Sequence, residues 1–316
     1  MNSEFFKILN NTVDEYLIYL NASDISDFKM FKHMDNIVLE NGIRTNWPYF
    51  RNKISLKKNI NIVNDFLSYL NIDYQEYFHQ CLKDKIFIFD KLATYDGYSM
   101  YNTETKKRSI YIPITNCIKD SFVIVHELMH DINSIDLINN GTRLSYTEAL
   151  SLLSGFLLED YLKENKVKDA KVVNTQNLIT ILDKSVEIDF NLKIVEKYLE
   201  HNYIDITSYR DIYDFYPSDY YVILNKTANK ILNYKQMTLN FEMRYIIGIL
   251  IATYMYDRTK QNKKNILELF DLNEIIKSRT FDDVLDYLDL EYDEFDLKEN
   301  SYHTLKNKYI KYVKSR

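Results

Sequence analysis

The stretch Ser121-Phe-Val-Ile-Val-His-Glu-Leu-Met-His-Asp-Ile-Asn-Ser134 decides the fold of this chain of 316 residues. It contains the pattern His126-Glu127-x-x-His130, and the four apolar residues before His126 predict a helix that is buried on most sides. Side chains four residues apart lie on one face of a helix, so two imidazoles at this spacing can bind one metal ion. Uncharged histidines and a carboxylate in a buried helix need polar partners, which a metal ion supplies.

Glu127 follows the first histidine directly, where its carboxylate can take a proton from a water molecule activated by zinc. We therefore predict one Zn²⁺ per chain, with His126 and His130 as two of its ligands and Glu127 as the general base. The competing interpretation is a solvent-exposed helix end that carries two unrelated histidines.

A third zinc ligand is expected from a second helix. Catalytic zinc usually has three protein ligands and one open position. Glu148 lies 18 positions after the second histidine, within a segment from about 144 to 163 that reads as a helix. We predict Glu148 as the third ligand, and Glu159 on the same face as its rival or as a residue that orients a ligand. Asp131 and Asp136 are weaker alternatives, and Glu148 as an ordinary surface glutamate stays open.

The rest of the chain predicts a mainly α-helical fold with a small antiparallel β-hairpin. Apolar residues recur at three- and four-residue spacing through residues 1–85. Residues 85–91 predict a short strand, and alternation between 95 and 115, after the turn signal Asp96-Gly97, predicts the hairpin. Pro113 cannot donate to a β-ladder, so we expect its strand at the edge, where an extended peptide can add to it. A hairpin that only covers the core is equally compatible.

An apolar segment near the C-terminus places two phenols on one helix face. Tyr245, Gly248, Ala252 and Tyr256 share this face. A phenol near zinc can stabilise the oxyanion of a tetrahedral intermediate, so we predict Tyr245 as a catalytic residue, with Tyr256 as a second candidate. A stripe that merely packs in the core is the alternative.

Composition excludes several classes of protein. The net charge is −6 and the longest basic cluster is Lys106-Lys107-Arg108, so we expect no nucleic-acid partner. No run approaches the roughly 18 apolar residues of a membrane span, and the first residues lack the apolar core of a signal peptide. Two cysteines, Cys81 and Cys117, fit a reducing compartment. We expect a cytoplasmic protein without a membrane span.

The ordered motifs resemble the gluzincin metallopeptidases, and among them the thimet oligopeptidase and oligoendopeptidase F family. Thr147 to Ser154 resembles the helix that carries that family's glutamate ligand, Tyr245-Ile-Ile-Gly248 its C-terminal Tyr/Gly helix, and Thr280 to Phe295 its closing helices. Met129 stands where the family usually has glycine. The resemblance implies a zincin-like catalytic core, helices on both sides of a substrate cleft, and short peptides as substrates.

No segment is rich enough in Gly, Pro or Ser to be a flexible linker, since the chain has only 5 Gly and 3 Pro. We expect an N-terminal helical region over 1–85, the catalytic core over 86–260, and a C-terminal helical region over 261–316 that forms one unit with the core.

These observations predict a zinc-dependent metalloendopeptidase that hydrolyses peptide bonds, with a peptide as its partner. One alternative is a dedicated protease that processes a single protein or leader peptide. The other is a catalytically inactive zinc-binding interaction protein. Glu127 argues against the inactive protein, because a scaffold has no need of a carboxylate beside the metal.

Overall fold

The computed structural model describes residues 3–22, 49–93, 96–102, 104–134, 141–235, 237 and 239–261. These residues are mainly helical and include a three-stranded sheet, which confirms the predicted fold class. The elements in chain order are α1 (Ser3–Ala22), α4 (Leu56–Leu70), α5 (Ile72–Lys83), β1 (Phe87–Asp90), β2 (Tyr98–Asn102), β3 (Lys107–Pro113), α6 (Lys119–Ser134), α7 (Gly141–Glu164), α8 (Ala170–His201), α9 (Ile206–Asp214), the 3₁₀ turn η1 (Ser218–Tyr220), α10 (Tyr221–Tyr234) and α11 (Leu239–Gln261).

The chain forms two compact units, each built from two separate segments. Unit 1 comprises Met1–Ile43 and Ile179–Ile247, and unit 2 comprises Arg44–Leu178 and Gly248–Arg316. Both α8 and α11 contribute residues to each unit. The boundaries predicted after residues 85 and 260 stay predictions, and the region 261–316 lies outside the described residues.

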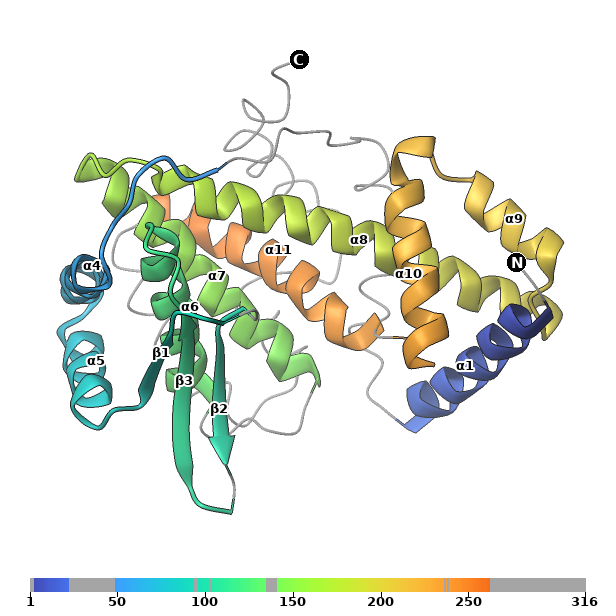
Figure 1. The fold of residues 1–316 in the computed structure, drawn as a ribbon, viewed down its shortest axis with the longest axis horizontal. Helices are drawn as coiled ribbons and strands as arrows, with labels where there is room; N and C mark the ends of the chain where they lie inside the picture. The colour runs from blue at the N-terminus through green and yellow to red at the C-terminus, as the bar shows by residue number, and fades with distance from the viewer. Residues whose placement is uncertain are drawn as a thin grey trace. The chain divides into compact units, whose positions relative to one another are not determined.

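The sheet of unit 2 has the strand order β1-β3-β2 (Figure 1). Strands β2 and β3 pair antiparallel, which confirms the predicted hairpin, and Tyr98 lies opposite Tyr111. Strand β1 pairs parallel with β3, so the sheet is mixed and β3 is its central strand. The prediction that the strand of Pro113 lies at the edge is therefore wrong.

The position of Pro113 explains why a central strand tolerates it. On the β1 side, Ile110 N–H donates to Ile86 and Ile114 N–H donates to Asp90. An N–H at Pro113 would point the other way, toward β2, whose ladder with β3 has already ended at Tyr111. The missing donor thus removes no ladder hydrogen bond.

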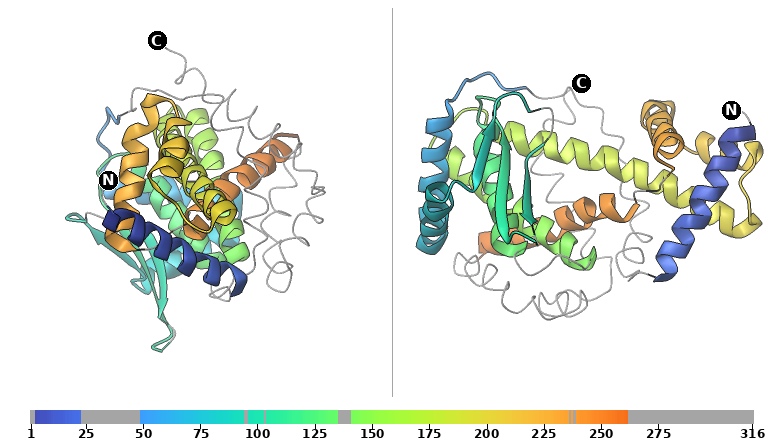
Figure 2. Two further views of the ribbon diagram at one scale, coloured as in Figure 1. Left: turned by 90° about the vertical axis from the view of Figure 1, so that its right-hand side faces the viewer. Right: turned by 60° about the horizontal axis from the view of Figure 1, so that its bottom comes forward.

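Helix α6 packs against the sheet, α4 and α7 at the centre of unit 2 (Figures 1 and 2). The side chains between these elements are fully buried, including Phe66, Ile110, Ile112, Ile124 and Leu128. The helix begins at Lys119, directly before Asp120. Asp120 is buried and accepts hydrogen bonds from Thr115 N–H at 2.8 Å and Asn116 N–H at 3.1 Å, which ties the incoming loop to the start of the helix.

Unit 1 has an aromatic core of its own. Edge-to-face contacts join the Tyr209 ring to Phe5 and to Phe190, at centroid distances of 5.3 Å and 5.9 Å. Two buried carboxylates of α8 are paired, because Tyr216 donates to Asp189 at 2.5 Å and Lys230 lies 2.5 Å from Glu187. These contacts join α1, α8, α9 and α10 into one body.

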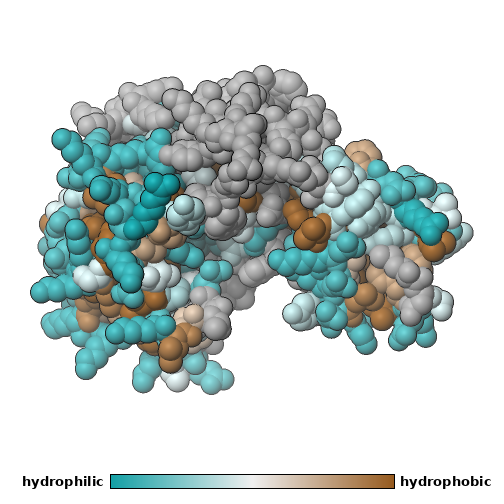
Figure 3. All heavy atoms as spheres, turned by 45° about the horizontal axis from the view of Figure 1, so that its top comes forward, coloured by the Kyte–Doolittle hydropathy of each residue, from teal (hydrophilic) through white to brown (hydrophobic). Residues whose placement is uncertain are grey.

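Hydrophilic side chains cover most of the described surface visible in Figure 3, and hydrophobic ones form scattered patches. Within the described ranges, we find no helix with the length and apolar character that crossing a membrane requires.

Candidate metal centre

Helix α6 places both histidines of the predicted motif on one face. Their Nε2 atoms are 3.1 Å apart and their rings meet edge to face, with centroids separated by 4.7 Å. The side chains are 25% and 15% exposed for His126 and His130 respectively, so the pair lies at the border between the core and solvent. The four-residue spacing on a regular helix accounts for this geometry.

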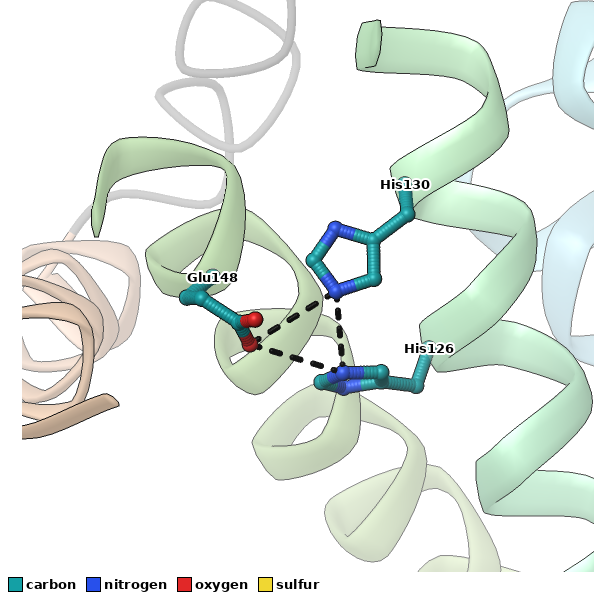
Figure 4. Close-up of side chains that lie close together, drawn as sticks. All are labelled: His126, His130 and Glu148. Atoms are coloured by element: carbon teal, nitrogen blue, oxygen red, sulfur yellow. Dashed lines mark hydrogen bonds and ion pairs between the residues drawn. The ribbon is translucent and has the colours of Figure 1, made fainter. Parts of the chain in front are cut away.

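Helix α7 brings Glu148 to the same point. Its Oε2 atom lies 3.6 Å from His126 Nε2 and 3.5 Å from His130 Nε2, and all three side chains point toward one another in Figure 4. Glu148 is only 3% exposed. The structure therefore gathers the three residues that the sequence suggested as zinc ligands.

The spacing of these three atoms suits a zinc ion. A tetrahedral zinc site with bonds of about 2.0–2.1 Å requires neighbouring ligand atoms about 3.3 Å apart. The observed separations of 3.1, 3.5 and 3.6 Å lie around that value. Two imidazoles and one carboxylate are also a donor set that catalytic zinc uses, with a fourth position left for water or substrate. Within the described residues, His126, His130 and Glu148 form the one group of three or more side chains able to hold a metal.

The rival carboxylates have other partners. Glu159 is fully buried on α7, accepts a hydrogen bond from Asn174 at 2.7 Å and forms an ion pair with Lys163. Asp131 accepts hydrogen bonds from Tyr77 and Arg108, and Asp136 lies outside the described residues. Glu159 is thus placed to fix α7 against α8 rather than to meet the two histidines.

Asp131 anchors the helix of the histidines to the strand and helix beside it. Its Oδ2 atom accepts hydrogen bonds from Tyr77 of α5 at 2.6 Å and from Arg108 of β3 at 3.1 Å, and Arg108 also donates to the Tyr77 hydroxyl. Burial and the hydrogen bond to Asp131 raise the pKa of Tyr77, so the phenol keeps its proton. Burial together with the charge of Asp131 raises the pKa of the nearby Cys81 thiol to about 11. This cluster was not predictable from the sequence, because Arg108 and Tyr77 lie on different elements and carry no local signal of their contact with Asp131.

The two candidate phenols have different surroundings. Tyr256 belongs to unit 2, where its hydroxyl donates to Asp160 and its ring packs on Phe156. Burial, followed by the hydrogen bond to Asp160, raises its pKa. Tyr245 belongs to unit 1, is half-buried, and has the ammonium group of Lys184 over its ring, 4.2 Å from the centroid. A catalytic role for Tyr245 stays a prediction.

Comparison with solved structures identifies the fold. PZ peptidase A with an inhibitor matches with a TM-score of 0.57 at 13% identity, over 97% of this chain and 59% of that chain. A protein described as an oligoendopeptidase F from Bacillus anthracis matches with a TM-score of 0.53 at 15% identity, over 97% and 56% of the two chains. A protein described as a peptidase from Chlamydophila abortus matches with a TM-score of 0.52 at 14% identity, over 99% and 56%.

The sequence itself matches no family model and no curated protein. This chain spans less than three fifths of the length of the structures that it resembles. Over almost the whole of its own length, it has the fold of oligoendopeptidase F and PZ peptidase, as its motifs predicted.

Proposed function

We propose that this protein is a zinc-dependent metalloendopeptidase. The observation that carries the proposal is the triangle of His126 Nε2, His130 Nε2 and Glu148 Oε2, whose sides match the edges of a tetrahedral zinc site. The fold also supports the proposal, since the solved structures that share it are described as peptidases.

Each residue of the centre has a distinct role in this proposal. His126, His130 and Glu148 hold the zinc ion. Zinc supplies Lewis acidity, which lowers the pKa of water and polarises a peptide carbonyl. Glu127, which is 6% exposed, accepts the proton of the attacking water and delivers it to the leaving amine. Tyr245 is proposed to donate a hydrogen bond to the oxyanion.

The sheet offers a place for an extended peptide. Since β3 is the central strand, β2 is the edge strand on the hairpin side of the sheet, and β2 contacts α6. A peptide that adds to β2 as a further strand would run beside the helix of the histidines and be held by main-chain hydrogen bonds. The proposed docking strand is therefore β2 and no longer the strand of Pro113. The physical reason is unchanged, because an edge strand offers free main-chain groups to an extended peptide.

Short peptides are the proposed substrates, and a dedicated protease for one protein is the alternative. The compartment is proposed to be the cytoplasm, because Cys81 and Cys117 are free and buried, as a reducing compartment allows.

The direct test is to purify the protein, measure its metal content and assay a library of quenched fluorescent peptides beside Glu127→Gln. We expect one zinc per chain in both proteins, and cleavage of many unrelated short peptides by the wild type alone. Zinc without cleavage of any library peptide would favour the dedicated protease or the inactive protein. A chain that binds no zinc would refute the proposal.

A further inference from the structure

The residue before β2 lies directly against the proposed general base. A Cβ atom added to Gly97 would lie 2.4 Å from Val123 Cγ1, 3.1 Å from Glu127 Cγ and 3.2 Å from Glu127 Oε1. Carbon atoms in contact are normally about 3.5–4.0 Å apart, so the first of these contacts is impossible without movement. The space that a side chain would occupy at Gly97 is already filled by α6.

Glycine is needed at this position for close approach rather than for backbone conformation. Its φ angle is not positive, so the backbone itself would accept any residue. Val123 cannot rotate away easily, because a β-branched side chain in a helix has one strongly preferred rotamer. Val123 and Glu127 are four residues apart on α6, and Gly97 therefore covers one ridge of that helix.

A weak, solvent-exposed ion pair lies beside the same ridge. Asp96 Oδ1 lies 3.9 Å from the ammonium group of Lys119, which precedes Val123 by four positions on α6. Of these contacts, the close approach of Gly97 to Val123 and Glu127 is the one that carries the argument. Glu127 is only 6% exposed, whereas the side chain of His126 beside it is 25% exposed.

We propose that Gly97 is a positioning residue for Glu127: its missing side chain lets the main chain that enters β2 press on the glutamate and hold its carboxylate in one place. This inference rests on the proposed function for its catalytic meaning. It also adds a constraint on β2, since the same main chain fixes the proposed peptide-binding strand relative to the base.

The test is Gly97→Ala, compared with Val123→Ala and with the double variant. The added methyl group should displace Glu127 and lower kcat by about 10-fold to 100-fold, the effect of a misplacement of about 1 Å, with KM nearly unchanged. One zinc per chain should remain, because none of the three atoms nearest to the added methyl group belongs to a proposed metal ligand. Val123→Ala in the same chain removes the atom at 2.4 Å but leaves the contacts at 3.1 and 3.2 Å with Glu127, so kcat of the double variant should stay below that of the wild type, while Val123→Ala alone should resemble the wild type.

Gly155→Ala is the matched control for adding one methyl group to a glycine of unit 2. A Cβ there would lie 3.3 Å from Asn174 Oδ1 and 3.9 Å from Phe122 Cδ1, and it would not meet Glu127. We expect a kcat close to that of the wild type. Unchanged kcat in Gly97→Ala, loss of its zinc, or full rescue of its kcat by Val123→Ala would each overturn the proposal.

A crystal structure of zinc-loaded Gly97→Ala supplies a readout that needs no turnover. A displaced Glu127 carboxylate supports the positioning role even if the wild type cleaves no peptide, in which case only the proposed function fails. A carboxylate in its original place overturns the positioning role even if the wild type is an active peptidase.

Discussion

Glu148 Oε2 lies 3.5 Å from His130 Nε2, although the two residues are on different helices and 18 positions apart. The 24-residue helix α7 brings the carboxylate back to α6. Glu148 is buried, and a buried carboxylate is stable when it is paired with a cation or binds a metal ion. This relationship adds a third candidate ligand to the two histidines, and it leads to the first prediction.

Glu148→Gln should reduce zinc affinity by more than the roughly 10-fold to 100-fold expected for loss of an outer contact, because it removes a direct ligand charge. Competition with a chelator of known affinity measures the change. Glu159→Gln is the matched control on the same helix and should keep its zinc, since Glu159 is bound to Asn174 and Lys163. The reverse result would make Glu159 the ligand.

Glu127→Gln should keep one zinc per chain and lose peptide hydrolysis by about 10²-fold to 10⁴-fold, the typical contribution of a general base. Glutamine has the same size but does not accept the proton of the attacking water. Steady-state kinetics on a quenched peptide, together with metal analysis, measure both effects. Full activity in this variant would rule out Glu127 as the base.

Tyr245→Phe should lower kcat by about 10²-fold to 10³-fold if the phenol stabilises the oxyanion, since that is the cost of losing one such donor. KM should change little, because the hydrogen bond forms in the transition state. Tyr256→Phe is the comparison. Its hydroxyl is bonded to Asp160, so we expect a lower thermal midpoint and a nearly unchanged kcat. Equal kcat in Tyr245→Phe and wild type would remove Tyr245 from the mechanism.

Arg108→Ala should destabilise the protein by on the order of 3 kcal/mol, because it leaves the buried carboxylate of Asp131 without its cation. Urea denaturation monitored by circular dichroism measures the free energy of unfolding. Lys107→Ala, at the exposed neighbouring position of β3, should stay within about 0.5 kcal/mol of the wild type. Equal stabilities of the two variants would show that the cluster does not anchor α6.

Asp169 should make stability depend on pH in the acidic range. Its partial burial opposes ionisation, but hydrogen bonds from the Asn52 side chain and from the backbone of Arg51 and Asn52 outweigh it and lower the pKa of Asp169. The stabilisation is therefore present above the unfolded pKa of about 3.9 and is lost as the pH falls through the lower folded value.

Asp169→Asn should accordingly be less stable than the wild type at pH 6, and the difference should shrink toward pH 3. Urea denaturation across this range measures it. Asp211→Asn, an exposed residue with the same change of charge, should show a smaller difference at pH 6. A gap between wild type and Asp169→Asn that is constant with pH would contradict this account.

The local parts of the site were predictable. Residues that interact at four-residue spacing on one helix need no information from elsewhere in the chain, so the pairing of His126 with His130 followed from the pattern alone. The hairpin of β2 and β3 was equally local, because a polar turn between two alternating runs specifies antiparallel pairing. The short strand β1 was also visible in its composition.

The arrangement of these parts was not predictable in the same way. The parallel pairing of β1 with β3 makes β3 central, and a pairing between distant segments leaves no signature within either of them. The face that α7 turns toward the histidines places Glu148, and not Glu159, beside them, and that face is set by the packing of α7 on α6 and by the hydrogen bond from Asn174 to Glu159.

The sequence by itself determined which chemistry to predict for this protein, since two histidines and a glutamate on one helix are sufficient to predict a zinc ligand pair and a base. Only the tertiary structure decided what lies around these residues: Glu148 beside the two histidines, Asp131 held by Arg108 and Tyr77, and the main chain at Gly97 against Glu127. The physical reason is the distance along the sequence between the residues that interact. Helical spacing is set by neighbouring residues, whereas these contacts depend on how whole elements pack to bury their apolar faces.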